Sequence, residues 1–153
     1  SRGQGFSLDS KHRNRLEGGK RPFHTIIPAF LTKDGRPVMP FGVMGGDFQP
    51  QGHSQVIMNM IDFGMSPQQA TDVPRVEHTG SSDPWGTTVG AGGRLVFERG
   101  FADATIVALA QMGHDISPNI TAHGGYQSIW REENPRRYFG GSDPRKDGCA
   151  IGY

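Results

Sequence analysis

The sequence has one cysteine, almost no excess charge and no long hydrophobic run. Cys149 stands alone among 153 residues, so no disulfide can close within the chain, and we expect Cys149 to be a small buried residue. The formal net charge is +1, so no strong basic field indicates a nucleic-acid partner. No apolar stretch approaches the roughly 18–20 residues of a membrane span. We therefore expect neither a nucleic-acid partner nor a membrane-spanning segment.

The signatures of several common catalytic and metal-binding classes are also missing. There is no G-x-S-x-G nucleophile elbow, no H-E-x-x-H and no C-x-x-C. The six histidines are scattered, so a zinc site is not predicted. The glycine-rich pieces GQGFS and GAGG lack the strand-then-helix context of a dinucleotide-binding loop. We expect no metal and no organic cofactor.

The first residues, SRGQGFSLDSKHRNRLEGGKRPF, contain neither an initial methionine nor the hydrophobic region of a signal peptide. They look like the interior of a longer protein. We expect the chain to be one piece of a larger precursor, and the sequence leaves its cellular compartment open.

Glycine and proline are abundant, with 23 and 11 residues. They lie between apolar runs and are not concentrated in one segment, which favours a loop-rich globular unit over a low-complexity chain. A length of 153 residues suits one domain with one core.

Hydrophobic periodicity predicts strands and helices in mixed order. Helices are expected at residues 51–63, from Ser66 to just before Pro74, and at 101–112. Ser66, Pro67 and Gln69 have the pattern of a capped helix start. Strands are expected at residues 25–32, 36–44, 94–98, 126–130 and 137–140, and the first two are joined by an Asp-Gly hairpin turn. Without a regular βαβ rhythm, this order favours an α+β fold.

The stretch VMPFGVMGGDFQPQGH, residues 38–53, places Gly45 and Gly46 between a strand and a helix. A tight turn is one explanation. Another is that bare backbone N–H groups here converge on an anion. Against a substrate carbonyl they would form an oxyanion hole.

Four segments resemble the γ-glutamyltranspeptidase family. They are GKRPFHTIIPAF (residues 19–30), GVMGGD (42–47), IDFGMSPQQATDVPR (61–75) and GGSDPRKDGCAIGY (140–153). The segments occur in the family's order, near its spacing, and extend over nearly the whole chain. Residues 1–153 thus look like the C-terminal portion of the family's small subunit.

This resemblance implies an N-terminal-nucleophile hydrolase fold, an αββα sandwich of which this chain is part. In that family the precursor cuts itself in two. The new N-terminal Thr of the small subunit attacks a γ-glutamyl amide such as glutathione, with its own amine as base. The acyl group then passes to water or to an amino acid. That Thr would lie upstream of Ser1, so we expect this piece to be inactive without its partners, the large subunit and the rest of the small subunit.

The resemblance also implies roles for particular residues. Gly45 and Gly46 match the family's oxyanion-hole glycines. His24 and Thr25 match a Ser-Ser pair that holds the substrate's α-carboxylate, and only Thr25 keeps a hydroxyl. Arg2 and Gly5 fall where the family uses Gln and Asp to bind the donor's α-amino group. Arg2 cannot accept from an ammonium but suits a carboxylate, so these departures put classical glutathione specificity in doubt.

Three further positions are expected to be structural. Asp47, where the family has Ser, is expected to cap the following helix. Pro74 and Arg75 are expected to shape a turn. The S-D-P-R motif at residues 142–145 is expected to form a turn with an Asp–Arg contact.

Two alternatives remain open from sequence. The departures at His24 and Arg2 favour a cephalosporin- or glutaryl-acylase type of activity on the same scaffold. A non-catalytic relative that binds small anionic metabolites is the other.

Overall fold

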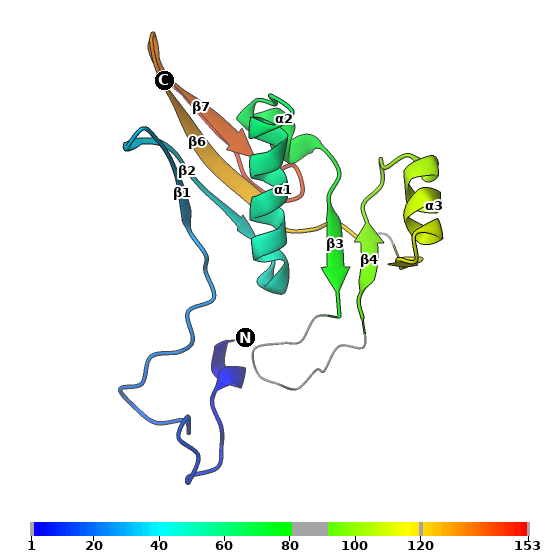
Figure 1. Ribbon diagram of the computed structural model, residues 1–153. Coiled ribbons are helices and arrows are strands. Elements are labelled where there is room, and N and C mark those ends of the chain that lie inside the picture. Colours follow the sequence, from blue (N-terminus) through cyan, green and yellow to red (C-terminus); the bar gives the residue numbers. More distant parts are fainter. Residues whose placement is uncertain (1, 81–91, 120, 153) are drawn as a thin grey trace.

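The computed structural model describes residues 2–80, 92–119 and 121–152, with two antiparallel-rich sheets and three α-helices (Figure 1). The four-stranded sheet has the order β1-β2-β6-β7. Its strands are β1 (Ala29–Lys33), β2 (Arg36–Met44), β6 (Gly125–Glu133) and β7 (Arg136–Ser142). The three-stranded sheet has the order β3-β4-β5. Its strands are β3 (Val76–Thr79), β4 (Arg94–Phe97) and β5 (Asp115–Ile116). This mixed architecture is the expected α+β class.

The helices are α1 (Gln49–Ile61), α2 (Pro67–Asp72) and α3 (Asp103–Gln111), preceded by the 3-10 turns η1 (Arg2–Gly5) and η2 (Gly46–Phe48). Helices α1 and α2 pack against the four-stranded sheet and against each other, and these contacts form the core. That core contains the buried side chains of Val43, Phe48, Val56, Ala70 and Tyr126.

The β1–β2 hairpin closes as the Asp-Gly signal predicts. Asp34 and Gly35 have φ of 51° and 74°, the positive values that a type I′ turn requires. Strand β1, however, begins at Ala29, four residues later than expected from the apolar run. The preceding residues are held instead by a helix side chain, as described below.

The start of α2 also matches its predicted signal. Ser66 is the N-cap and accepts from the N–H of Gln69, the Gln69 side chain accepts from the N–H of Ser66, and Pro67 is the first helical residue. This reciprocal capping box satisfies two N–H groups that the helix itself cannot.

Two glutamines of α1 join the helix to the edge of the three-stranded sheet. The Gln51 carboxamide accepts from the N–H of His78 (2.8 Å) and donates to its carbonyl (2.9 Å). One helical turn later, Gln55 makes the same two bonds to Val76, at 3.0 and 2.8 Å. Each carboxamide makes the hydrogen bonds to β3 that a neighbouring strand would make. Helix α1 therefore connects both sheets.

Some expectations were wrong or lie outside the described residues. Strands β3 and β5 were not predicted. The sequence of residues 78–93 predicts turns, but His78 and Thr79 belong to β3, and residues 81–91 lie outside the described residues. Cys149 is exposed, not buried, because it lies in the irregular segment after β7.

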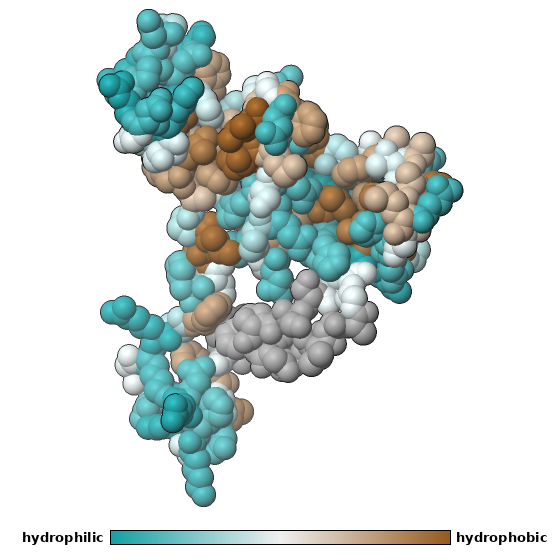
Figure 2. Space-filling model, viewed as in Figure 1, coloured by the Kyte–Doolittle hydropathy of each residue, from teal (hydrophilic) through white to brown (hydrophobic). Residues whose placement is uncertain are grey.

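The outer face of α1 is apolar in part. Met58 and Ile61 of α1, and Phe63 just after it, are 51%, 61% and 68% exposed, and Figure 2 shows hydrophobic residues beside the upper part of this helix. Within the described residues no helix is long and apolar enough to cross a membrane.

Candidate active site

The glycine turn, Gly45 and Gly46, lies directly after β2 and opens η2. The two residues have φ of 144° and 60°, values that side-chain-bearing residues rarely adopt. In the part of the chain that the structure describes, no hydrogen bond uses the N–H of either glycine, although the Gly45 carbonyl accepts from Phe48. Two adjacent N–H groups are therefore available to a ligand.

Close packing against a third glycine fixes this turn. A Cβ on Gly45 would lie 3.1 Å from the Cα of Gly124 and 3.3 Å from the Phe48 ring. A Cβ on Gly124, whose φ is 72°, would lie 2.7 Å from the carbonyl oxygen of Met44. The segments that contain Gly45 and Gly124 approach too closely for a side chain on either glycine. This packing explains the glycine at position 45 better than turn propensity alone.

Asp47 does not cap α1, contrary to expectation. No side chain caps η2 or α1, and the N-cap position of α1 is occupied by Phe48, because η2 runs directly into the helix. The carboxylate of Asp47 instead stands in the first turn of η2, next to the glycine turn.

His53 joins the first turns of α1 to β2. Its Nε2 accepts from the N–H of Val43 at 3.0 Å, and its ring meets Phe41 edge-on at 5.3 Å. Burial lowers the pKa of His53, and a hydrogen bond to the backbone of Gln49 opposes this only partly. The imidazole is therefore held neutral. Its Nε2 accepts from Val43, two residues before Gly45.

Gln49 brings the segment of Thr25 to the glycine turn. Its Nε2 donates to the carbonyl of Thr25 (2.7 Å) and of Gly46 (3.2 Å), while its Oε1 accepts from the N–H of Ile27 (3.2 Å). One buried carboxamide thus contacts both Thr25 and Gly46, two residues that the sequence predicts to share a site.

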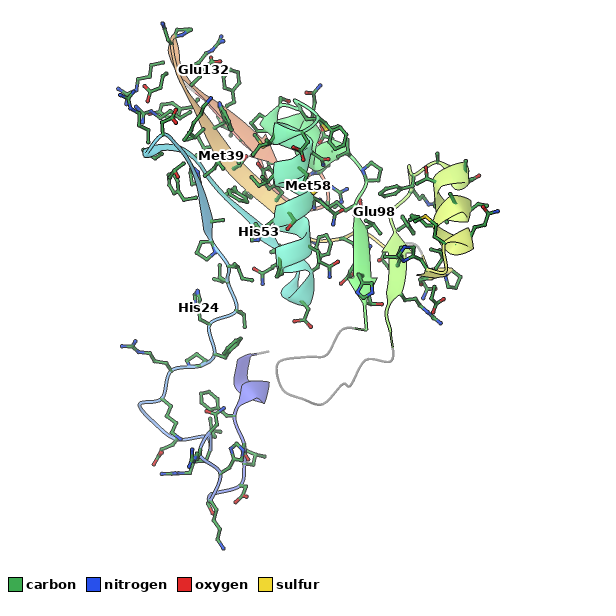
Figure 3. All side chains as sticks on the ribbon, in the orientation of Figure 1. His24, Met39, His53, Met58, Glu98 and Glu132 are labelled. Carbon is green, nitrogen blue, oxygen red and sulfur yellow. The ribbon has the colours of Figure 1, made fainter. Side chains whose placement is uncertain are left out.

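The other expected binding residues are less closely associated with the turn. His24 is exposed on the extended segment leading to β1 (Figure 3). Arg2 belongs to η1, and its side chain lies outside the described part of the structure. Their substrate roles remain predictions.

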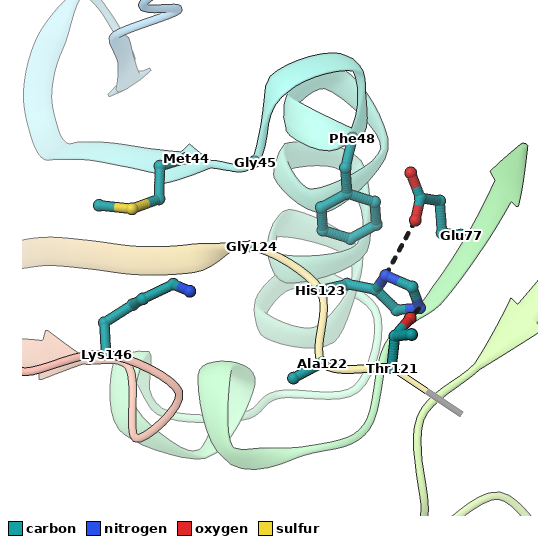
Figure 4. A pocket seen from close by; sticks show the side chains of 9 residues that line it. All are labelled: Met44, Gly45, Phe48, Glu77, Thr121, Ala122, His123, Gly124 and Lys146. Carbon is teal, nitrogen blue, oxygen red and sulfur yellow. Dashed lines mark hydrogen bonds and ion pairs between the residues drawn. The ribbon is translucent and has the colours of Figure 1, made fainter. Parts of the chain in front are cut away.

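A pocket of about 330 Å³ adjoins the glycine turn (Figure 4). Gly45, Gly124 and Phe48 line one part, His123 and Glu77 another, and Lys146 a third. The pocket therefore combines backbone of the turn with three ionisable side chains from separate elements.

His123 is the buried polar group of this pocket. Its Nδ1 lies 2.9 Å from the Glu77 carboxylate and its Nε2 lies 3.1 Å from the carbonyl of Val96. Its ring stacks on Phe48 with centroids 5.2 Å apart. Each ring nitrogen thus lies within hydrogen-bond distance of an oxygen, which fixes the orientation of the imidazole in the pocket. Sequence gave no signal for this pair, because Glu77 and His123 are far apart in the chain.

A buried ion cluster underlies the site. Arg75 pairs with Asp143 at 2.8 Å, their side chains 1% and 0% exposed. Arg145 contacts Asp143 at 3.1 Å and makes two hydrogen bonds to Glu98. The expected Asp–Arg contact in the S-D-P-R turn is confirmed, as is a structural role for Arg75, which also donates to the carbonyl of His123 at 2.8 Å.

The pKa values of the cluster follow from its hydrogen bonds. Burial alone raises the pKa of Glu98 and of Asp143, but donors from Arg145, Arg75 and backbone N–H groups outweigh it, so both pKa values lie below their ordinary range. Burial lowers the pKa of Arg145, and Glu98 and Asp143 more than reverse this. All three groups are held charged.

In residues 2–80, 92–119 and 121–152, no three His, Cys, Asp or Glu side chains are grouped as metal ligands. The described part of the site therefore offers the backbone N–H donors of Gly45 and Gly46, the hydroxyl of Thr25 and the ammonium of Lys146.

Three comparisons with known proteins give matches that cover nearly the whole chain. A family model described as gamma-glutamyltranspeptidase matches residues 1–153. The glutathione hydrolase-like YwrD proenzyme of Bacillus subtilis (strain 168) is 39% identical over 155 residues, which cover 99% of this chain and 28% of that protein. The oxamate amidohydrolase proenzyme of Klebsiella pneumoniae is 37% identical, with 100% and 28% covered. A crystal structure of cephalosporin acylase from Bacillus halodurans has a TM-score of 0.76 and 44% identity, with 99% and 27% covered.

Proposed function

The chain belongs to the gamma-glutamyltranspeptidase family, and we propose that it supplies the oxyanion hole and part of the acyl-donor pocket of an N-terminal-nucleophile amide hydrolase or acyltransferase. The α+β fold is that of this hydrolase class. The chain spans about 28% of the length of the curated relatives named above, so the activity of the whole protein is part of this proposal.

The glycine turn carries this proposal. Gly45 and Gly46 offer two adjacent N–H groups that donate to no partner among the described residues. Close packing requires glycine at 45, and a φ of 60° favours glycine at 46. Preorganised donors of this kind stabilise the negative oxygen of a tetrahedral intermediate, and removal of one costs roughly 3–4 kcal/mol in known cases.

The reaction follows from an N-terminal Thr of the same precursor. Its hydroxyl oxygen attacks the amide carbon while its α-amine takes the hydroxyl proton, and the carbonyl oxygen becomes an oxyanion at Gly45 and Gly46. The C–N bond then breaks, and the α-ammonium returns a proton to the leaving amine. Water, or an amino acid, repeats the sequence on the acyl-enzyme and releases the acid or the new amide.

The first candidate substrates are γ-glutamyl amides of the glutathione type. Acyl amides without an α-amino group, as a cephalosporin or glutaryl acylase would use, are the second. The replacements at Arg2 and Gly5 favour the second group, since neither residue offers an acceptor for an ammonium.

We propose that residues 1–153 are the C-terminal portion of the small subunit, with the remainder of the precursor as partner. The exposed apolar residues Met58 and Ile61 on α1, and Phe63 just after it, support a cover of this kind.

Intact-mass and N-terminal analysis of the full-length protein, followed by assay with amide substrates, tests the proposal. The expected result is two chains, the smaller one opening with Thr, and release of p-nitroaniline from γ-glutamyl- or glutaryl-p-nitroanilide. An uncut chain that releases nothing would contradict it and leave the non-catalytic alternative.

A further inference from the structure

Gly124, the residue against which the glycine turn packs, belongs to a segment without regular secondary structure. Residues 121–124 lead into β6 and are part of neither sheet. A Cβ on Gly45 would lie 3.1 Å from the Cα of Gly124, and Figure 4 shows the two glycines beside one another. The backbone position of Gly45 therefore depends on what holds the residue before Gly124.

Two buried side chains hold the backbone of His123 from opposite sides of the residue. Glu98 follows directly after β4, and its Oε1 accepts from the N–H of His123 at 2.6 Å. The Nη1 of Arg75 donates to the carbonyl of His123 at 2.8 Å. Glu98 is 8% exposed and Arg75 is 1% exposed. Both polar groups of this backbone are thus fixed, whatever the protonation state of the imidazole.

Glu98 and Arg75 are also fixed relative to each other. The Oε2 of Glu98 accepts from the N–H of Arg75 at 2.8 Å, and the N–H of Glu98 donates to the carbonyl of Arg75 at 3.0 Å. The guanidinium of Arg75 pairs with Asp143 at 2.8 Å, and the Nε of Arg145 donates to Glu98 at 2.7 Å. Buried networks of this kind rigidify the residues that they join.

We propose that Glu98 and Arg75 are positioning residues of the oxyanion hole, which hold Gly124 in place behind Gly45 by binding the backbone of His123. This inference rests on the function proposed above and adds two buried residues that act only through the turn. Preorganised donors are effective at one geometry, and a displacement of about 1 Å at a reacting centre costs about a hundredfold in rate. Weaker support behind Gly45 would therefore slow acylation.

The kinetic test compares Glu98→Gln with Thr71→Val in the full-length protein. In Glu98→Gln an NH₂ group replaces one carboxylate oxygen, so the N–H of His123 or that of Arg75 loses its acceptor. Thr71 is fully buried in the same cluster and hydrogen-bonds Asp143 and Arg75. Its replacement by Val removes those two bonds and leaves both bonds to His123.

We expect Glu98→Gln to lower kcat about tenfold to a hundredfold and to change KM less than about threefold. Rates are normalised to the self-cleaved fraction. Thr71→Val is expected to lower stability and to leave kcat within about threefold. Arg75→Lys is the second variant, because one ammonium cannot span the two acceptors that the guanidinium fork reaches, and it should reproduce the kcat loss. Equal kcat losses in Thr71→Val and Glu98→Gln would overturn the proposal.

A double-mutant cycle shows whether Glu98 acts through the turn. If it does, the Gly45→Ala substitution already disrupts the geometry that Glu98 maintains, and the two effects are not additive. We expect Glu98→Gln to slow acylation less than about threefold in the Gly45→Ala background. The same fold loss in both backgrounds would show that Glu98 acts elsewhere and would overturn the proposal.

Hydrogen exchange followed by mass spectrometry separates this proposal from the catalytic one, because it needs no turnover. The N–H of Phe48 donates to the carbonyl of Gly45 at 3.2 Å, so peptides that span residues 41–48 report on the turn. We expect faster exchange there in Glu98→Gln and no change in Thr71→Val.

The two measurements together decide between the proposals. If the unsubstituted protein cleaves no amide but Glu98→Gln alone speeds exchange at residues 41–48, the positioning role stands and the proposed activity fails. If amides are cleaved and Glu98→Gln matches Thr71→Val in both kcat and exchange, the activity stands and the positioning role is wrong.

Discussion

The Nε2 of Gln49 lies 2.7 Å from the carbonyl oxygen of Thr25, a residue 24 positions earlier in the chain. The same nitrogen donates to the Gly46 carbonyl at 3.2 Å. One carboxamide at the start of α1 therefore sets the distance between the segment proposed to bind substrate and the turn proposed to bind the oxyanion.

Replacement of Gln49 by Leu removes this connection. We expect kcat/KM of the full-length protein to fall by about a hundredfold, since a displacement of 1 Å at a reacting centre has an effect of that order. The comparison is Gln55→Leu, which removes two hydrogen bonds from the same helix to Val76, away from the turn. Gln55→Leu is expected to lower stability and leave kcat/KM within about threefold. Equal kinetic losses in the two variants would show that Gln49 has no particular role.

His53 gives the site a dependence on pH. Its folded pKa is lowered by burial, so the fold favours the neutral ring. Its contribution to stability is fully present above the unfolded pKa of about 6.5. It is lost as pH falls from there through the lower folded pKa.

Urea unfolding of the full-length protein between pH 8 and 5 measures this effect. We expect the unsubstituted protein to lose more stability on acidification than His53→Gln, whose amide oxygen can still accept from Val43 but does not titrate. His53→Phe, which leaves that N–H without its acceptor, is expected to cost about 1–3 kcal/mol. Parallel pH profiles for the protein and His53→Gln would contradict the assignment.

The buried ion cluster predicts a large cost for removing one partner. Asp143→Ala leaves Arg75, 1% exposed, without its carboxylate, and we expect a loss of about 3–5 kcal/mol in the free energy of unfolding. The control is Asp115→Ala, which breaks an ion pair with Arg94 whose side chains are 58% and 54% exposed, and should cost under about 1 kcal/mol. Denaturant titration of the full-length variants compares the two, and similar losses would be inconsistent with a cooperative buried cluster.

Local chemistry made part of the structure predictable from sequence. The capping box of Ser66 and Gln69 and the Asp34-Gly35 turn depend on residues within three positions of one another, and both are confirmed. The family resemblance predicted that Gly45, Gly46 and Thr25 share a site. The hydrogen bonds from Gln49 to Thr25 and Gly46 account for the proximity of the two segments.

Long-range pairing accounts for what sequence reasoning missed. Strand β3 is four residues long, and its edge is completed by Gln51 and Gln55 of α1, which leaves no periodic signal in its own sequence. The Glu77–His123 pair joins positions 46 residues apart, a relationship set by the fold alone. Asp47 was expected to cap α1 from local preference, but η2 continues into the helix without such a cap.

The central claim is that the N–H groups of Gly45 and Gly46 stabilise an oxyanion, and single-turnover acylation of Gly45→Ala tests it most directly. The reference is Gly42→Ala, at a glycine with ordinary φ and open space around it. Rates are normalised to the fraction of chain that has undergone self-cleavage. We predict that Gly45→Ala slows acylation by about 10²–10³-fold, while Gly42→Ala changes it less than about threefold. Acylation by Gly45→Ala at the rate of Gly42→Ala would contradict the claim.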